Sequence, residues 1–214
     1  MTRISRASRL SLAVMVALGV AVPATPGQAV TDPFDELPTS EEMKRALITP
    51  EEIAPAYQQS TQGGGRDTVY LTTAEACARN ATNGHLVDYV MQDFKHYQGP
   101  TIIEQRVAAV GSEQALDMIA AYVGMVRKCP SRRVGPGMLT ISRWKGPRLG
   151  DASVGLLYER TGSTGQLVDR DITVLVAHGA VVLTMQHLNN QNSGDEANFR
   201  STLLAAAAKL DEIG

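Results

Sequence analysis

Two neighbouring apolar segments, residues 171–177 and 180–188, constrain the fold of this chain more than any other feature of its sequence. In the first segment, Ile172, Val174 and Val176 alternate with residues that are also apolar, so both faces of a strand would be hydrophobic. Strands of this kind lie in the centre of a sheet that is covered on each side. The turn that joins the two segments is so short that the strands must pair antiparallel.

Other segments extend this sheet and cover it. Four more have strand composition and are bounded by turn signals, namely residues 85–96, 101–110, 138–145 and 152–160. Helices are expected to begin near Ser112, where apolar residues repeat at helical spacing, and near Ser193. Gly63–Gly65 is interpreted as a flexible linker. Because short turns force antiparallel pairing, we expect an α+β fold with a single mostly antiparallel sheet of five or six strands, helices packed on it, and one disulfide.

Residues 1–29 have the pattern of a secretory signal peptide. Three arginines precede the apolar run 10–22, and Gly27 and Ala29 supply the small residues of a cleavage site. The alternative is a buried N-terminal helix, which Pro23 and Pro26 would interrupt at once. We therefore expect a secreted, extracytoplasmic protein that is soluble after the signal peptide is removed.

The next segment, residues 30–46, is expected to be a flexible lead-in to a domain over residues 47–214. It holds few apolar residues and is broken by Pro33 and Pro38, although Phe34 could instead dock into a cleft as a plug. No later segment approaches the roughly 20 apolar residues of a membrane helix, so we expect no membrane span. Loss of the three N-terminal arginines takes the formal net charge from −2 to about −5, which argues against nucleic acid as a partner.

Cys77 and Cys129 are the two cysteines of the chain, and Cys77 lies in a segment, residues 72–79, with helical character. In an oxidising compartment they predict one disulfide, which would stabilise the fold by about 2–4 kcal/mol. The alternative is a redox-active or metal-binding pair. It has no support, because the sequence contains no CxxC motif and no histidine at metal-ligand spacing from either cysteine.

Catalytic motifs are weak throughout the chain. Ser153 lies in a sequence that resembles a nucleophile elbow, but Asp151 stands where that motif requires glycine, and the segment joins two strands. The glycine-rich stretch at residues 62–66 lacks the lysine of a phosphate loop. The four histidines, His85, His96, His178 and His187, form no HxH or HxxxH pair. We expect no catalytic residues, no metal site and no cofactor.

Surface recognition is the remaining chemistry that the sequence offers. Arg143 and Lys145 flank Trp144, the only tryptophan, and Tyr158 lies on the next predicted strand. Aromatic residues beside arginine are typical of recognition patches. Arg143, Trp144 and Tyr158 are therefore candidate ligand-binding residues, with the alternative that Trp144 simply packs against a helix.

The order of these elements resembles the PknH-like extracellular sensor domains of actinobacteria. The resemblance rests on Ile48–Ile53, Cys129–Pro130, Leu149–Ser153 and the hairpin over residues 171–188, and it spans most of residues 46–213. It implies an antiparallel sheet with packed helices and a cleft thought to bind a ligand. Some members carry two disulfides, whereas this chain can form one, and it has no kinase domain. The chain is similar to a stand-alone secreted member of this family.

The leading hypothesis is a secreted, non-enzymatic sensor or ligand-binding domain of the cell envelope. Its expected partner is an unidentified small molecule or cell-envelope component, or a protein. Two alternatives stay open: a secreted enzyme with an unrecognised site, and a cell-envelope interaction or scaffold protein. A cleft lined by aromatic and neutral polar groups would favour binding. A histidine near both a nucleophile and an acid would favour the enzyme.

Overall fold

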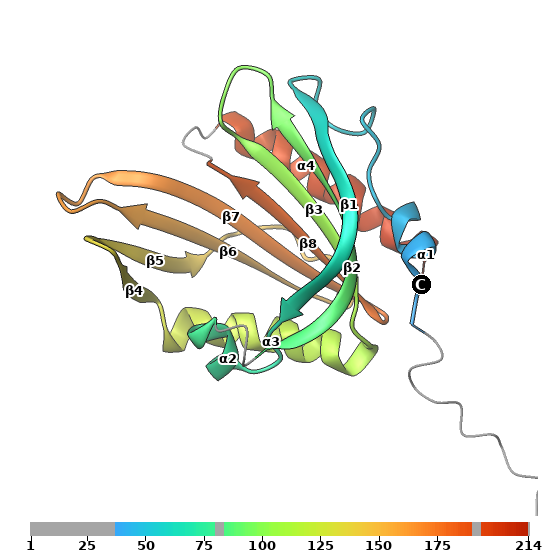
Figure 1. The fold of residues 1–214 in the computed structure, drawn as a ribbon, viewed down its shortest axis with the longest axis horizontal. Helices are drawn as coiled ribbons and strands as arrows, with labels where there is room; N and C mark the ends of the chain where they lie inside the picture. The colour runs from blue at the N-terminus through green and yellow to red at the C-terminus, as the bar shows by residue number, and fades with distance from the viewer. Residues whose placement is uncertain (1–36, 80–83, 190–193, 214) are drawn as a thin grey trace, which may run out of the picture. The chain divides into compact units, whose positions relative to one another are not determined.

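The computed structural model describes residues 37–79, 84–189 and 194–213 (Figure 1). The chain divides into two units between Thr31 and Asp32, and every described residue belongs to the second unit. The predicted signal peptide, residues 1–29, and the first part of the predicted lead-in, residues 30–36, lie outside the described residues. In the part of the chain that is described, no helix is long and apolar enough to cross a membrane.

The described residues form one antiparallel sheet of eight strands, with the spatial order β1-β2-β3-β8-β7-β6-β5-β4. The α+β class is confirmed, but the prediction of five or six strands is wrong. The strands are β1 (Tyr57–Val69), β2 (His85–His96), β3 (Ile102–Ala109), β4 (Ser131–Val134), β5 (Gly137–Arg143), β6 (Ala152–Thr161), β7 (Leu167–His178) and β8 (Val181–Leu188).

The two strands at the edges of the sheet, β1 and β4, account for the difference between the predicted and the observed number of strands, because neither has an apolar pattern. β1 is polar through most of its length and pairs with β2 from end to end, so Gly63–Gly65 belongs to a strand and is no linker. Gly64 is needed there because a Cβ atom at this position would lie 2.8 Å from the Tyr89 carbonyl oxygen. All four residues of β4 are exposed, which leaves no buried face to detect in the sequence.

The central hairpin is confirmed, and helices cover both of its faces (Figure 1). One face of the whole sheet packs against α1 (Ser40–Arg45), α4 (Gly194–Ala208) and the short 3₁₀ helix η2 (Lys209–Glu212). The opposite face packs against α2 (Thr73–Ala78) and α3 (Ser112–Lys128). β7 supplies Val174 and Val176 to the first face and Leu175 and Ala177 to the second. The sheet therefore separates two hydrophobic cores.

The described part of the predicted lead-in is packed against the sheet. Met43 of α1 is 1% exposed and Ala46 is fully buried, and both belong to the core beneath α4. Thr39 caps α1 through a capping box with Glu42. Residues 37–46, which were expected to be flexible, therefore supply two buried side chains to this core.

Two buried glutamines hold the chain that follows α1. The Gln105 side chain accepts a hydrogen bond from the Ile48 amide at 2.9 Å and donates one to the Ala46 carbonyl at 2.8 Å. Gln92 donates to the Gln105 side-chain oxygen at 2.9 Å and to the Ile48 carbonyl. These bonds satisfy backbone groups that have left the helix and would otherwise be buried without partners. The glutamine pair thus fixes residues 46–48 on β2 and β3.

Replacing Gln105 with alanine should destabilise the protein by about 2–4 kcal/mol, because the Ile48 amide and the Ala46 carbonyl lose buried partners. Urea-induced unfolding followed by circular dichroism measures this change. The matched control is Gln58→Ala on the exposed side of β1, which should stay within about 0.5 kcal/mol of the parent. Equal unfolding midpoints for Gln105→Ala and the parent would contradict this account of the anchor.

Candidate functional site

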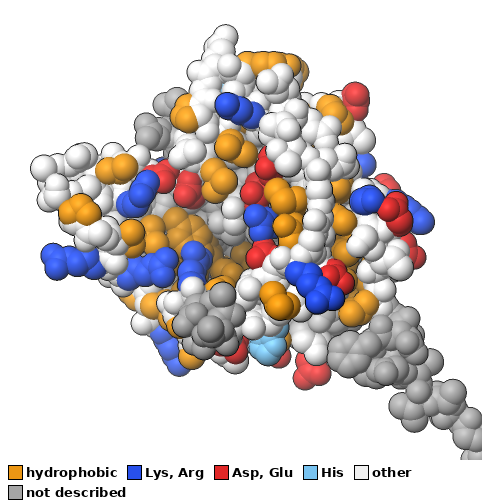
Figure 2. Space-filling view, viewed as in Figure 1, with side chains coloured by type: hydrophobic (Ala, Val, Ile, Leu, Met, Phe, Trp, Pro, Cys, Tyr) orange, Lys and Arg blue, Asp and Glu red, His pale blue; other side chains and the backbone are white. Residues whose placement is uncertain are grey.

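A cavity of about 440 Å³ lies on the sheet face that carries α2 and α3. Figure 2 shows a hollow on this side of the molecule, with hydrophobic side chains in its depth and Lys and Arg side chains along one lip. Six strands, α3 and Arg79 at the end of α2 contribute to the lining. It consists of Asp67, Thr68, Val69, Tyr70, Arg79, Val87, Tyr89, Arg106, Ala108, Met118, Tyr122, Tyr158, Thr173, Leu175, Val182, Thr184 and Gln186.

The cavity exists because α3 covers only part of this face. Along β8, Val182, Thr184 and Gln186 point to the cavity side, since alternate residues of a strand face the same way. Val182 is buried beneath the helix, whereas Thr184 and Gln186 are half-buried and polar. The same change occurs on β7 between Leu175 and Thr173. The sheet face therefore turns from apolar to polar where the helical cover ends.

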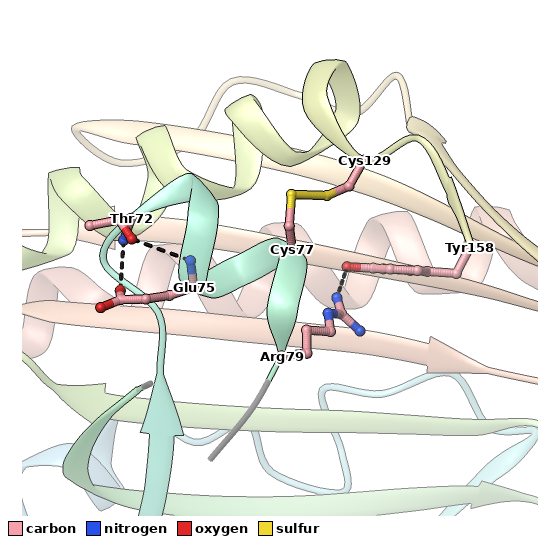
Figure 3. Close-up of a disulfide and its surroundings, with 6 residues drawn as sticks. All are labelled: Thr72, Glu75, Cys77, Arg79, Cys129 and Tyr158. Atoms are coloured by element: carbon pink, nitrogen blue, oxygen red, sulfur yellow. Dashed lines mark hydrogen bonds between the residues drawn. A yellow bond between two sulfur atoms is a disulfide. The ribbon is translucent and has the colours of Figure 1, made fainter. Parts of the chain in front are cut away.

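A disulfide between Cys77 and Cys129 joins α2 to the C-terminal end of α3, as the sequence predicted (Figure 3). α2 begins with a capping box between Thr72 and Glu75. It ends at Arg79, which has the left-handed conformation with φ 43° and ψ 46°. The disulfide and the two helix ends therefore determine where the Arg79 side chain begins.

Arg79 and Tyr158 form a close pair at the cavity wall. The Arg79 guanidinium donates a hydrogen bond to the Tyr158 hydroxyl and lies 4.8 Å from the centroid of its ring (Figure 3). Burial raises the pKa of Tyr158, and the positive charges of Arg79 and Arg132 oppose that rise. Burial also raises the pKa of Tyr122 on α3. Both hydroxyls are therefore neutral at physiological pH and can donate hydrogen bonds.

A second arginine lies on the opposite wall, within a group of carboxylates. Arg106 forms ion pairs with Asp67 and, at 2.5 Å, with Glu104. Its guanidinium lies 5.3 Å from the centroid of the Tyr89 ring. Two carboxylates thus neutralise Arg106, and the local formal charge of the three groups is negative.

The three predicted binding residues are not brought together. Tyr158 lines the cavity, but Trp144 is 7% exposed and belongs to the core on the other face of the sheet. Arg143 is exposed at the end of β5 and does not line the cavity. The alternative reading of Trp144 as a packing residue is the one that its position supports.

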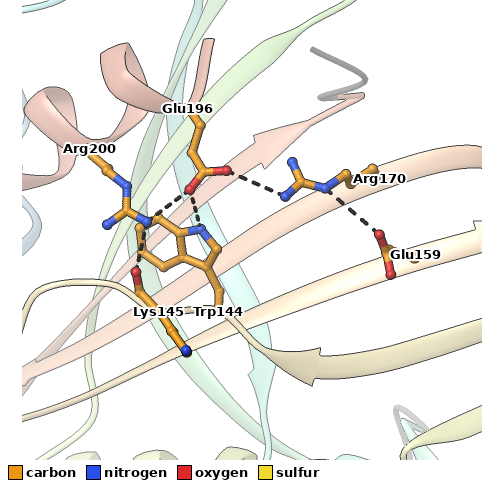
Figure 4. Close-up of polar contacts among 6 residues, drawn as sticks. All are labelled: Trp144, Lys145, Glu159, Arg170, Glu196 and Arg200. Carbon is orange, nitrogen blue, oxygen red and sulfur yellow. Dashed lines mark hydrogen bonds and ion pairs between the residues drawn. The ribbon is translucent and has the colours of Figure 1, made fainter. Parts of the chain in front are cut away.

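Trp144 holds α4 on the sheet through a polar network (Figure 4). Its indole N–H donates to Glu196 at 2.9 Å, and the Arg200 guanidinium lies 4.2 Å from the centroid of its ring. Arg200 also donates to Glu196 at 2.9 Å and to the Lys145 carbonyl at 2.8 Å. Arg170 on β7 forms an ion pair with Glu196 at 3.4 Å. Of the residues that suggested a recognition patch, Trp144 thus serves to dock a helix, and the cations around it are Arg170 and Arg200.

The histidines and the serine of the elbow-like motif have other surroundings. No histidine lines the cavity within residues 37–79, 84–189 and 194–213. His187 is buried on the α4 side, stacked on Phe199 with ring centroids 5.0 Å apart, and burial lowers its pKa to about 4. The Ser153 hydroxyl accepts a hydrogen bond from the Leu149 amide, and the Asp151 carboxylate accepts one from Gly179. Ser153 therefore stabilises the connection between β5 and β6, and Asp151 ties this connection to the turn between β7 and β8.

A metal site finds no support among the described residues, where no group of three or more His, Cys, Asp or Glu side chains could hold an ion.

Sequence reasoning missed most of the cavity residues, notably Arg79, Tyr89, Arg106 and Tyr122. One signal was available: Tyr122 interrupts the aliphatic face of the helix that begins at Ser112. No comparable signal marks the others, because which side of a strand faces a cavity depends on the helix that covers it.

A scan against protein-family models finds no match for this chain, and a search of curated proteins finds no match either. Among solved structures, the chain is similar to the extracellular domain of PknH from Mycobacterium tuberculosis. The two are 12% identical in sequence, the TM-score is 0.49, and the match covers 83% of this chain and 98% of that one. Membership of the PknH-like family stays a prediction.

Replacing both Cys77 and Cys129 with serine should lower the free energy of unfolding by about 2–4 kcal/mol, since the bond closes a loop of 52 residues. Guanidinium-induced unfolding of the parent and the double variant measures this loss. Adding a reductant should bring the parent close to the variant and leave the variant unchanged. An unfolding midpoint that is the same in all four samples would contradict a structural role for this bond.

Proposed function

We propose that this protein is a non-enzymatic ligand-binding module of the cell envelope and that the cavity between the sheet and α3 holds a small molecule. The observation that carries the proposal is the cavity of about 440 Å³, with an apolar floor and a few convergent polar groups. Small-molecule sites have this size and composition. Arg79, Tyr122, Tyr158 and Gln186 supply hydrogen-bonding groups from four different elements.

Export from the cytoplasm is part of this proposal. The Cys77–Cys129 bond joins two helices that are distant in the sequence, and structural disulfides of this kind persist in oxidising compartments. The signal-peptide pattern of residues 1–29 points to the same location. A sensor role would add a partner that reads the occupied state of the cavity.

A binding role is favoured over catalysis by the chemistry of the lining. The described lining residues include no histidine, cysteine or serine, so among them the cavity offers neither a serine or cysteine nucleophile nor a histidine base. Its charged members are Asp67, Arg79 and Arg106, and two of these are paired with each other. Aromatic rings, hydroxyls and one amide make up most of the remaining polar surface.

A protein partner is the second candidate function, and one surface favours it. One end of the sheet carries four exposed apolar residues, on β4, on β5 and, beyond β6, on β7, namely Val134, Met138, Leu167 and Val168. Exposed apolar groups that gather on one surface are typical of interaction sites. In a sensor, this end of the sheet would contact the partner while the cavity holds the ligand.

The variant Thr184→Trp tests the proposed function, because Thr184 lies on the cavity side of β8 and a tryptophan there fills the space that a ligand needs. We expect the parent to show thermal shifts with members of a panel of cell-envelope metabolites, and the variant to lose these shifts while it keeps its far-ultraviolet circular dichroism. Thr140→Trp, on the exposed side of β5, is the matched control and should respond like the parent. Ligand-induced shifts of equal size in Thr184→Trp would contradict the proposal.

A further inference from the structure

The two arginines of the cavity differ in their electrostatic surroundings. Arg106 is neutralised by Asp67 and Glu104, as described above. In the part of the chain that the structure describes, none of the ion pairs involves Arg79. Its side-chain contacts are with the hydroxyl and the ring of Tyr158, which carry no charge. Arg79 thus brings to the cavity wall a positive charge that, among the described residues, forms no ion pair with a carboxylate.

A second cation lies beside Arg79. Arg79 and Arg132 border the same small hollow next to the disulfide, and the positive charges of both act on Tyr158. Arg132 belongs to β4, whose four residues are exposed. Figure 2 shows Lys and Arg side chains along one lip of the hollow. An anion at Arg79 would therefore also be attracted by Arg132.

The backbone at Arg79 is an independent sign that its side chain is needed there. Helices that end in the left-handed conformation usually place glycine or asparagine at that position. An arginine held at φ 43° and ψ 46° has a cost that glycine would avoid. Conformations of this kind are concentrated at ligand-binding positions.

The cavity floor beyond these cations is hydrophobic. Aliphatic side chains from five strands and α3 form it, namely Val69, Val87, Ala108, Met118, Leu175 and Val182. A small inorganic anion could pair with the arginines but would leave this floor in contact with water. The complementary ligand has a charged end and an apolar body.

We infer that the cavity binds an amphipathic anion, with a carboxylate or phosphate head at Arg79 and Arg132 and a hydrocarbon body on the aliphatic floor. This inference rests on the proposed function, because it names the class of ligand for the same cavity. The head forms charge-assisted hydrogen bonds with the guanidinium groups, and the planar fork of arginine suits both kinds of head. The body displaces water from the apolar surface.

Isothermal titration calorimetry with four probes of equal chain length tests the inference on the purified protein. The probes are dodecanoate, dodecyl phosphate, dodecanol and dodecylammonium, the ionic probes below their micelle concentrations and dodecanol below its solubility limit. We expect at least one of the anions to bind about tenfold more tightly than dodecanol, and dodecylammonium to bind most weakly. Tighter binding of the phosphate points to a phospholipid-like source, and tighter binding of the carboxylate to a fatty acid; both support the inference.

Variants at the cationic rim separate charge recognition from simple cavity filling. Arg79→Gln should weaken the binding of the preferred anion about tenfold and leave dodecanol unchanged, whereas Arg79→Lys should keep part of the preference. Arg133→Gln, which removes an exposed cation from the same strand as Arg132, is the matched control and should behave like the parent.

Equal affinity for the anions and dodecanol, no effect of Arg79→Gln, or no binding of any probe would overturn the inference. The first two results, together with loss of dodecanol binding in Thr184→Trp, would still support the cavity as a ligand site. Failure of the inference is thus distinguishable from failure of the proposed function.

Discussion

Burial of the β7–β8 hairpin on both faces is the constraint on which the rest of the structure depends. Val174 and Val176 pair with Met185 and Leu183 on one face, while Leu175 lies on the other. A hairpin of this kind is stable in water only when something covers each side. The chain meets this requirement twice, with α4 against one face of the hairpin and α3 against the other.

The two covers differ, and the difference creates the candidate site. The α4 side is closed by Trp144 and by the network around Glu196, which connects the helix to β7 and to the chain after β5. The α3 side is closed over only part of the sheet, and the cavity begins where the strands become polar. The disulfide fixes α2 to the end of α3 and thereby positions Arg79 at the rim. Covering both faces of the central hairpin thus leads to a packed core on one face of the sheet. On the other face it leaves a recessed surface with both apolar and polar residues.

The elements that the sequence predicted well are those whose side chains show which way they face. The central hairpin and the helix that begins at Ser112 have apolar residues at strand and helix spacing. The two cysteines indicate an oxidising compartment, where they pair. β1 could not be predicted in this way, because a polar edge strand owes its conformation to β2 and carries no apolar alternation of its own. The strand number was wrong for that reason, together with the exposed β4.

The candidate site was harder to predict than the fold. Trp144 and Tyr158 lie on neighbouring segments and were grouped by proximity, yet they belong to different cores on opposite sides of the sheet. Arg79 carries no motif at all, and its position follows from a helix end and a disulfide that connects segments far apart in the sequence. The sequence shows which aromatic and charged residues are present. Tertiary packing determines on which face of the sheet each of them lies.

The central claim is that the recessed face, and not the closed one, binds the ligand. Methyl-resolved NMR during titration with dodecanoate tests it most directly, because each face contributes its own methyl groups. The account predicts shifts at Ala108, Met118, Leu175 and Val182, which line the cavity. Shifts confined to Leu203 and the other methyl groups beneath α4, or to the exposed apolar end of β4, β5 and β7, would contradict it.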